Sequence, residues 1–410
     1  MNGSAGPRLK VNSFLELTRP HKIVNAALPK VAILTLGPNG EGTGEWSVQS
    51  GDIVEEEQVV GSGPQGKIFS PIPGRVIKIT KITLPNEGET IVAAIALEGS
   101  FKRTGKSSTL NPWEEWSSTR VFEMLDYFSY LATSSSLEAP FLLDPRARVK
   151  KLIVNLLQPE PYQTGWYHLS IEESQSIVTG IKIIKKLYSP SEIEFAIQNH
   201  PKDYAQQILS AFGSGSYTVT KYDTLYPSAH SKLLSGSKEH LILDPESLVS
   251  LANVVCFSCP QIETYVTVSG SGVAHPGVYR VRVGTPISAL LSECGVVEKA
   301  NFSVVLGGPF RGAHLKEDFM VTRMARSLLV LSQTERRAST EHPCIRCSAC
   351  VDSCPVSLNP IRLYEGLREK DESEGLRLEL HQCLECGICS AVCPSRIPLL
   401  HQFQLSRKQR

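Results

Sequence analysis

Eight of the eleven cysteines of this chain fall in two short blocks near its C-terminus. Both blocks have the spacing C-x2-C-x2-C-x3-C-P, and their cysteines are Cys344, Cys347, Cys350 and Cys354 in the first and Cys383, Cys386, Cys389 and Cys393 in the second. This spacing is typical of cubane iron–sulfur clusters. Structural zinc is the alternative, but zinc sites usually take C-x2-C pairs with a longer loop between them. The sequence therefore predicts two [4Fe-4S] clusters and electron transfer.

The order of the cysteines predicts which of them share a cluster. In two-cluster ferredoxins the fourth cysteine of each block ligates the other cluster. We therefore expect cluster 1 to be held by Cys344, Cys347, Cys350 and Cys393, and cluster 2 by Cys354, Cys383, Cys386 and Cys389. Residues 361–380, between the blocks, carry leucines among many charges and have no strong strand signal. We expect a helical ferredoxin-like domain.

Composition excludes several classes of function. The 42 Lys and Arg residues nearly balance the 41 Asp and Glu residues, which argues against a protein that binds nucleic acid by neutralising phosphates. No apolar run approaches the ~20 residues of a membrane span, so we expect no direct membrane insertion. No signal-peptide pattern is present, and clustered cysteines fit a reducing compartment. The basic stretch 407–410 is interpreted as a solvated tail and not as a lipid contact.

The first hundred residues predict short strands separated by turns. Residues 50–59 and 70–76 resemble the two halves of a biotinyl or lipoyl carrier domain, an all-β barrel-sandwich fold. A carrier needs its modified lysine near position 63, where this chain has Gly63, and Lys67 lies too close to the second half. A structural barrel-sandwich module is favoured over a covalent carrier.

The middle of the chain alternates strand and helix signals. Residues 101–120 suit a surface connection, and a helix is expected from Trp113 onward. Apolar or amphipathic segments follow at residues 152–157, 171–187, 193–197, 204–212 and 248–255. This alternation predicts an α/β layer with a largely parallel sheet. Cys256 and Cys259 form a further C-x2-C, for which buried structural cysteines are favoured over a redox pair or half a metal site, and Cys294 is interpreted in the same way.

A different unit begins at Thr264. Alternating strands around a Pro-Gly turn, a helix at residues 287–291 and a strand at residues 304–309 predict a small β-grasp-like module. This segment resembles the SLBB domain of complex I type proteins. The Gly307-Gly308-Pro309 turn could cradle an anion, although a tight structural turn is favoured.

Taken together, these segments resemble the C subunit of the Rnf-type ion-translocating electron transport complex. More distant likenesses are the A subunit of the sodium-translocating NADH:quinone reductase and the flavoprotein subunit of complex I. The expected fold is multidomain α/β plus all-β: a barrel-sandwich hybrid (1–100), a Rossmann-like α/β domain (101–262), an SLBB module (263–335) and an α-helical ferredoxin with two clusters (336–410).

The resemblance also implies a function. It implies a peripheral subunit on the cytoplasmic face of the cell membrane, with other Rnf-like subunits, some of them membrane-embedded, as partners. Electrons would come from NADH, through FMN where it is retained, or from another reduced donor. Their flow would be coupled to sodium or proton movement.

The flavin and NADH loop of that family departs from its pattern here. The glycine-rich loop is replaced by residues 137–143, which include Glu138, and a second family stretch becomes residues 155–162, where Asn155 and Glu160 survive but leucines replace small residues. Tyr226-Pro227 also lacks its following glycine. We expect FMN and NADH binding at Asn155 and Glu160 to be weakened or lost, leaving an iron–sulfur relay. The alternatives are an NADH-oxidising flavoprotein with a retained FMN site and a soluble iron–sulfur adaptor.

Overall fold

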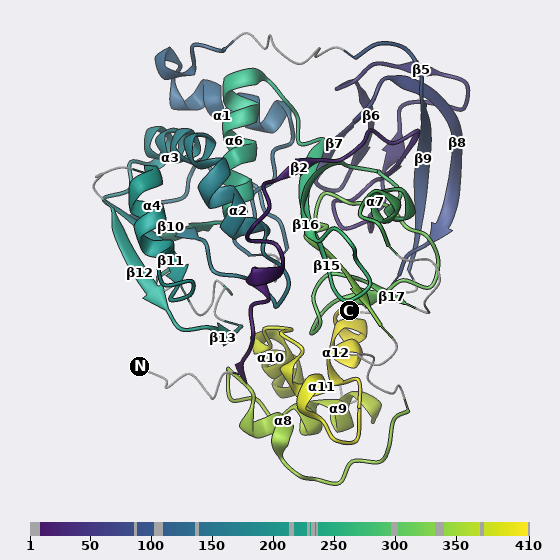
Figure 1. Cartoon of the computed structure of the whole chain (residues 1–410), viewed down its shortest axis with the longest axis vertical. Coiled ribbons are helices and arrows are strands. Elements are labelled where there is room, and N and C mark those ends of the chain that lie inside the picture. Colours follow the sequence, from purple (N-terminus) through teal and green to yellow (C-terminus); the bar gives the residue numbers. More distant parts are fainter. Residues whose placement is uncertain are drawn as a thin grey trace.

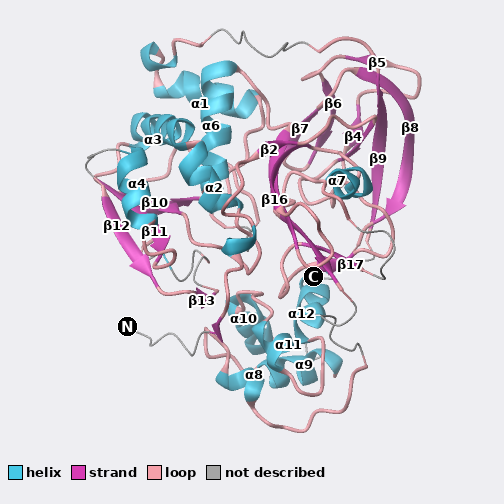
Figure 2. Cartoon of the chain, in the orientation of Figure 1, coloured by secondary structure: helices cyan, strands magenta, loops and turns pink. Residues whose placement is uncertain are grey.

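The structure is a computed structural model and describes residues 9–85, 88–101, 110–135, 139–212, 217–227, 230, 234, 237–296, 302–332, 340–369 and 373–408. In Figure 1 an α/β unit lies on the left, β-rich units lie on the right, and a helical unit forms the base. Figure 2 shows how the strands and helices separate between these units. The fold is the expected combination of α/β, all-β and helical parts. The domain boundaries stay predictions.

The barrel-sandwich part consists of two antiparallel sheets with orders β3-β9-β8-β5 and β4-β6-β7. Their strands are β3 (Val31–Thr35), β4 (Glu45–Trp46), β5 (Ile53–Val54), β6 (Val59–Gly63), β7 (Gly66–Phe69), β8 (Gly74–Thr83) and β9 (Glu89–Leu97). Alternate residues of β3 are buried, and Ala32 and Leu34 share a core with Ile72 and Ile95. The β6–β7 turn, where a carrier lysine would sit, is bonded to a later part of the chain: the backbone amide of Lys67 donates to Ser129 Oγ at 2.8 Å.

The α/β part contains a sheet of order β12-β11-β10-β14 whose pairs are all parallel, as predicted. Its strands are β10 (Lys151–Asn155), β11 (Glu192–Gln198), β12 (Thr218–Tyr222) and β14 (His240–Leu243). Its helices are η2 (Trp113–Glu115), α1 (Ser118–Tyr127), α2 (Gly165–Glu172), α3 (Ser174–Tyr188), α4 (Tyr204–Phe212) and α6 (Pro245–Phe257). Strand β10 is buried along most of its length because helices and neighbouring strands cover it, which explains its continuous apolar run.

One segment of this part is divided between two helices, and another lies within a longer helix. The amphipathic segment 171–187 is divided between α2 and α3, because Glu173 leaves helical geometry with φ −106° and ψ 22°. The apolar segment 248–255 lies within α6. This helix begins where the Asp244 side chain accepts a hydrogen bond from the Ser247 amide and Pro245 occupies the first turn.

The SLBB part is a mixed sheet of order β18-β17-β19-β15-β16-β2. Its elements are β15 (Glu263–Ser269), β16 (Gly277–Arg282), α7 (Ile287–Glu293), β17 (Ser303–Leu306), β18 (Ala313–His314) and β19 (Ser327–Leu331). Strand β2 (Val24–Asn25) comes from the N-terminal segment and pairs in parallel with β16. Strands β15 and β16 form the predicted antiparallel hairpin.

The N-terminal segment, residues 9–28, lies outside the barrel-sandwich sheets. Strand β1 (Leu9–Lys10) pairs with β13 (Leu225–Tyr226), and η1 (Leu15–Leu17) follows it. In Figure 1 this dark purple segment runs from the helical base along the α/β unit towards β2. It therefore ties three units together.

The C-terminal part is helical, and residues 340–369 and 373–408 contain no strand. Its helices are α8 (Ala349–Asp352), α9 (Pro360–Arg368), α10 (Glu374–Gln382), α11 (Ile388–Val392) and α12 (Leu399–Lys408). Side chains of Asn359 and Ser373 cap α9 and α10. Among the helices of the described residues, none is both long and apolar enough to cross a membrane.

Candidate iron–sulfur centre

The two cysteine blocks adopt the same local conformation. In each block a loop with two left-handed residues leads into a short helix, α8 or α11, that carries the third cysteine. The left-handed residues are Arg346 and Ser348 in the first block and Glu385 and Gly387 in the second. These turns allow the amides of Arg346 and Glu385 to donate to the sulfur atoms of Cys344 and Cys383, each at 3.3 Å.

Such amide–sulfur bonds favour thiolate ligands, because an N–H donor stabilises negative charge on sulfur. A third bond runs from the Leu358 amide to Cys354 Sγ at 3.3 Å. All eight cysteines of the blocks are free of disulfide bonds. The loops thus present reduced sulfur atoms together with donors that suit a charged cluster.

The fold brings the last cysteine of each block to the opposite block. Cys354 lines the same cavity as Cys383, Cys386 and Cys389. Burial raises the pKa of Cys386 to about 12, and the neighbouring thiols of Cys383 and Cys354 contribute to the rise. Cys350 lies near Cys393 and Cys344: burial raises the pKa of its thiol and both neighbours add to the shift. The last cysteine of each block thus lies near cysteines of the opposite block.

The two groups of cysteines differ in exposure. Cys344 and Cys347 are exposed, and Ile345 between them is 68% exposed. Cys354 and Cys386 are buried, and Cys383 and Cys389 are half-buried. The first group therefore reaches the molecular surface at Cys344 and Cys347, although its Cys393 is buried, whereas the second group has no exposed member.

The buried group borders the other units through an aromatic pair. Tyr226, which follows β12 in the α/β part, stacks on Phe310 of the SLBB part with ring centroids 4.5 Å apart and 14° between planes. The Tyr226 hydroxyl donates to the carbonyl oxygen of Cys386 at 2.5 Å. A Cβ on Gly387 would lie 2.3 Å from the Phe310 carbonyl oxygen, so glycine permits this close approach. Sequence reasoning missed Phe310, which no motif marks.

Asn155 and Glu160 lie in the region expected for flavin and NADH, but both make contacts within the protein. Asn155 is fully buried, and its side-chain Nδ2 donates to the Ser134 carbonyl oxygen at 2.8 Å. Glu160 Oε2 accepts hydrogen bonds from the amides of Phe310 at 3.0 Å and Arg311 at 3.2 Å. Burial raises the pKa of Glu160, although Arg311 and these amides act against the shift.

The Glu160 contact explains the Gly307-Gly308-Pro309 turn. A Cβ on Gly308 would lie 2.5 Å from Glu160 Oε2. The turn therefore approaches a carboxylate closely, and the anion beside it is a side chain of the chain itself. The amides that bind this carboxylate belong to Phe310 and Arg311, the two residues that follow the turn.

The N-terminal segment covers the second family stretch. The Ser13 carbonyl oxygen accepts from Gln158 Nε2 at 2.7 Å and from the Tyr162 amide at 3.1 Å. Phe14 stacks on Tyr162 with centroids 3.9 Å apart. Leu156 and Leu157 are buried in separate cores. Of the remaining loop residues, Leu137, Glu138, Ser228 and Ala229 lie outside the described part of the chain.

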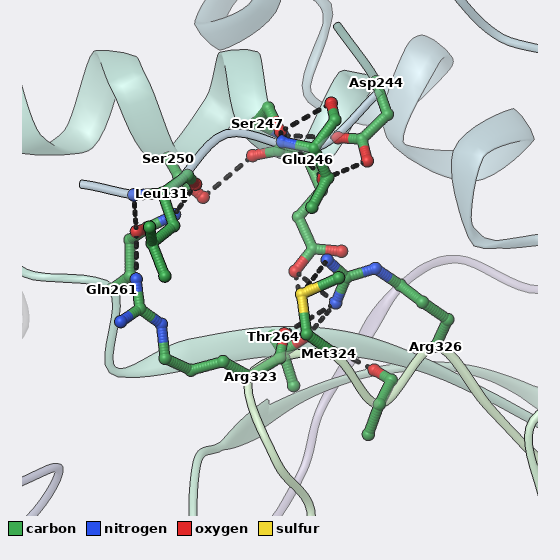
Figure 3. A network of polar contacts seen from close by, with 12 residues as sticks. Leu131, Asp244, Glu246, Ser247, Ser250, Gln261, Thr264, Arg323, Met324 and Arg326 are labelled. Carbon is green, nitrogen blue, oxygen red and sulfur yellow. Dashed lines mark hydrogen bonds and ion pairs between the residues drawn. The ribbon is translucent and has the colours of Figure 1, made fainter. Parts of the chain in front are cut away.

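A buried polar network joins the α/β and SLBB parts (Figure 3). Arg326 pairs with Glu246 at 3.2 Å and donates to Thr264 Oγ1 at 2.9 Å, and Thr264 donates to Glu246 at 2.8 Å. Arg323 extends to Gln261, which bonds both backbone polar groups of Leu131. Because the partners are distant in sequence, no local pattern indicated this network.

The remaining cysteines are separate from the two blocks. Cys256 and Cys294 are buried in the α/β and SLBB cores, and burial raises the pKa of each to about 11. Cys259 is half-buried, with its sulfur 3.6 Å from Glu57 Oε1. Cys256 and Cys259 form no disulfide.

Comparisons with known proteins recover two of the predicted domains. Residues 343–397 match the 4Fe-4S dicluster domain, and residues 265–308 match the SLBB domain. Two crystal structures of NAD+-reducing [NiFe]-hydrogenase, in the H2-reduced and air-oxidized states, align with a TM-score of 0.47 and 13% identity. They cover 72% and 75% of this chain and 61% and 68% of the hydrogenase chains.

Curated relatives carry the name of the C subunit of an ion-translocating oxidoreductase complex. The Haemophilus influenzae protein is 35% identical over 274 residues, covering 63% of this chain and 42% of its own length. The Pasteurella multocida protein is 35% identical, covering 63% and 33%. The Yersinia pestis protein is 28% identical over 384 residues, covering 87% and 60%. The chain thus spans between a third and three fifths of these relatives' length.

The matched dicluster domain and its clustered cysteines indicate two [4Fe-4S] clusters, which are the expected cofactors. The SLBB domain precedes it in the predicted order. The resemblance drawn from the cysteine blocks and the SLBB segment is confirmed, and the chain is a homologue of the C subunit of ion-translocating oxidoreductase complexes.

Proposed function

We propose that this chain is an electron-relay subunit of a membrane-bound ion-translocating oxidoreductase complex. The observation that carries the proposal is the interleaving of the two cysteine blocks, in which Cys354 joins the second block and Cys393 lies near Cys350 of the first. A cross-ligated pair of cubanes requires this arrangement. Two cubanes close to each other would provide consecutive one-electron steps.

The proposed ligands follow the same sets. Cys344, Cys347, Cys350 and Cys393 hold cluster 1, and Cys354, Cys383, Cys386 and Cys389 hold cluster 2. The bound clusters supply one-electron transfer at iron. The amides of Arg346, Leu358 and Glu385 stabilise the sulfur ligands, and the leucines and Phe403 around the second set exclude water.

We propose that the flavin and NADH site has been lost. Three observations support this: Asn155 and Glu160 are engaged by Ser134 and by the Phe310 turn, Leu156 and Leu157 fill core positions, and Phe14 stacks on Tyr162. The chain would then accept electrons from a donor other than a flavin of its own. An NADH-oxidising flavoprotein and a soluble adaptor are not favoured.

The partners and the location are part of the proposal. Exposed Cys344 and Cys347 make cluster 1 the end that a redox partner can approach, because electron transfer requires close contact. We expect membrane-embedded subunits to bind the chain as a peripheral subunit on the cytoplasmic face.

Anaerobic purification followed by iron, sulfide, zinc and flavin analysis tests the cofactors. Two cubanes require ~8 iron per chain. Zinc in place of iron would reject the relay, and stoichiometric FMN that NADH bleaches would reject the loss of the flavin site. The matched variant Cys294→Ser, in the SLBB core, should retain full iron, whereas Cys386→Ser should lose part of it.

Co-sedimentation tests the complex. The chain should sediment with membranes when membrane-embedded partner subunits are co-expressed, and stay in the supernatant without them. A chain that stays in the supernatant in both cases would support the soluble adaptor instead.

A further inference from the structure

The C-terminal helix α12 returns to the loop that carries Cys383 and Cys386. Within that loop Glu385 receives two side chains from α12. Gln404 Nε2 donates to Glu385 Oε2 at 3.3 Å, and Arg407 forms an ion pair with Glu385 Oε1. The first residue of the basic stretch 407–410 is therefore anchored, contrary to its interpretation as part of a solvated tail.

Arg407 also binds the backbone of the loop. Its Nη2 donates to the carbonyl oxygen of Leu380 and, at 3.1 Å, to that of Cys383. Its Nε is buried and has no acceptor among the described residues. Arg407 and Glu385 are only 28% and 20% exposed, so solvent screens their charges incompletely. Burial raises the pKa of Cys383 while the Arg407 charge acts in the opposite direction, which reflects how close the guanidinium lies.

The first cysteine block provides an internal comparison. Arg346 occupies the position of Glu385, with φ 54° against 52°, and makes the same amide–sulfur bond. Arg346 is exposed, and it carries the opposite charge. The backbone of the two loops is therefore alike, whereas the charges beside the sulfur atoms are not.

We propose that the charges of Arg407 and Glu385 shift the reduction potential of cluster 2 in opposite directions and together set its value. This proposal rests on the ligand sets of the proposed function. With cluster 2 bound at Cys354, Cys383, Cys386 and Cys389, reduction would add one electron that a reduced partner protein donates. A nearby guanidinium stabilises the added negative charge, and a carboxylate destabilises it. Glu385 offsets part of the effect of Arg407, and Gln404 holds the carboxylate in place.

A redox titration with dithionite, followed by electron paramagnetic resonance, measures the two midpoint potentials. In Arg407→Gln, one midpoint should move to a more negative potential. At a fixed potential, the ratio of reduced to oxidised cluster should fall about tenfold, which corresponds to a midpoint shift of ~59 mV for one electron. In Glu385→Gln the same midpoint should move in the positive direction. The double variant should lie between the single variants, and Arg407→Lys should lie nearest to the native protein.

Arg346→Gln is the matched control and should leave that midpoint unchanged. Midpoints that stay in place in both single variants, or that move in the same direction, would overturn the proposal. If Arg407→Gln binds less iron than the native protein, the proposal is tested by Glu385→Gln alone, whose midpoint should move in the positive direction. Iron and sulfide analysis separates this result from the relay itself: a native protein without two cubanes rejects the proposed function, whereas two cubanes with unmoved midpoints reject only the tuning.

Discussion

At the scale of single residues, Glu246 is a buried acid whose surroundings change its pKa strongly. Burial raises its pKa to about 7, although Arg326 favours the charged form. In the unfolded chain its pKa is close to the ordinary value of 4.5. Between these values the folded protein holds a proton that the unfolded chain has released, so stability falls as the pH rises through this window.

We therefore expect the pH dependence of Glu246→Gln to differ from that of the native protein. The unfolding free energy of the native protein, relative to the variant, should fall between about pH 4.5 and pH 7 by at most about 1.4 kcal/mol per pH unit. Denaturant titrations at four pH values in this window measure the difference. A constant difference would contradict the shift.

Gly308 gives a second prediction at this scale. In Gly308→Ala the new methyl group would meet the Glu160 carboxylate, so the turn or the carboxylate must move. We expect a loss of about 1–3 kcal/mol in unfolding free energy, typical of overpacking. The control is Gly375→Ala, whose Cβ would have no neighbour within 4 Å. Equal stabilities of the two variants in thermal unfolding would contradict this expectation.

Residues differ in how far sequence predicts their environment. The eight cysteines were identifiable as cluster ligands because [4Fe-4S] clusters use a characteristic cysteine spacing that lies within a short stretch of sequence. The partners of Glu160 and Arg407 were not, because Arg311 and Glu385 lie 151 and 22 residues away and only folding brings them together. The sequence shows that Arg346 and Glu385 carry opposite charges at equivalent positions of the two blocks. It does not show that Arg407 of α12 pairs with Glu385.

At the scale of elements, the α3–α6 contact depends on a glycine. A Cβ on Gly180 of α3 would lie 2.5 Å from the Leu248 carbonyl oxygen of α6. Alanine favours helix by up to ~1 kcal/mol over glycine, but here the two helices would have to separate. Gly180→Ala should therefore lower the unfolding free energy by roughly 1–3 kcal/mol.

The same control, Gly375→Ala in α10, should have an unchanged or higher unfolding free energy, because its added methyl group meets nothing. Chemical denaturation of both variants gives the comparison. A Gly180→Ala protein as stable as the control would show that α3 and α6 adjust without cost.

Elements were predictable where a local pattern determined them. The parallel sheet and the helices between the cysteine blocks followed from periodicity. The break at Glu173 did not, because the apolar spacing continues through it. Strand β2 was also missed: two residues carry no strand signal, and it forms because β16 offers an edge.

At the scale of the whole molecule, the helical part is attached to the rest at the buried group of cysteines. Leu384, Cys386 and Ile388 share a small core with Tyr226, Phe310 and Leu9 and Val11 of the N-terminal segment. The aromatic side chains of Tyr226 and Phe310 therefore pack between Cys386 and the α/β part, whereas Cys344 and Cys347 of the first block are exposed. This arrangement fits the proposed electron relay, in which the buried cysteines are packed against the rest of the molecule and the exposed cysteines are accessible to a redox partner.

Removing iron should loosen the helical part alone. Cys354 and Cys393 lie in its core, with Cys350, Cys383 and Cys389 packed against it, so chelation leaves buried thiols without their metal partners. The core around β10 and β11 contains none of these cysteines and should keep its structure. Hydrogen exchange should therefore show lost protection in α9–α12 and unchanged protection in β10 and β11. Unchanged protection in both parts would mean that helix packing alone maintains the C-terminal fold; lost protection in both would mean that the units unfold together.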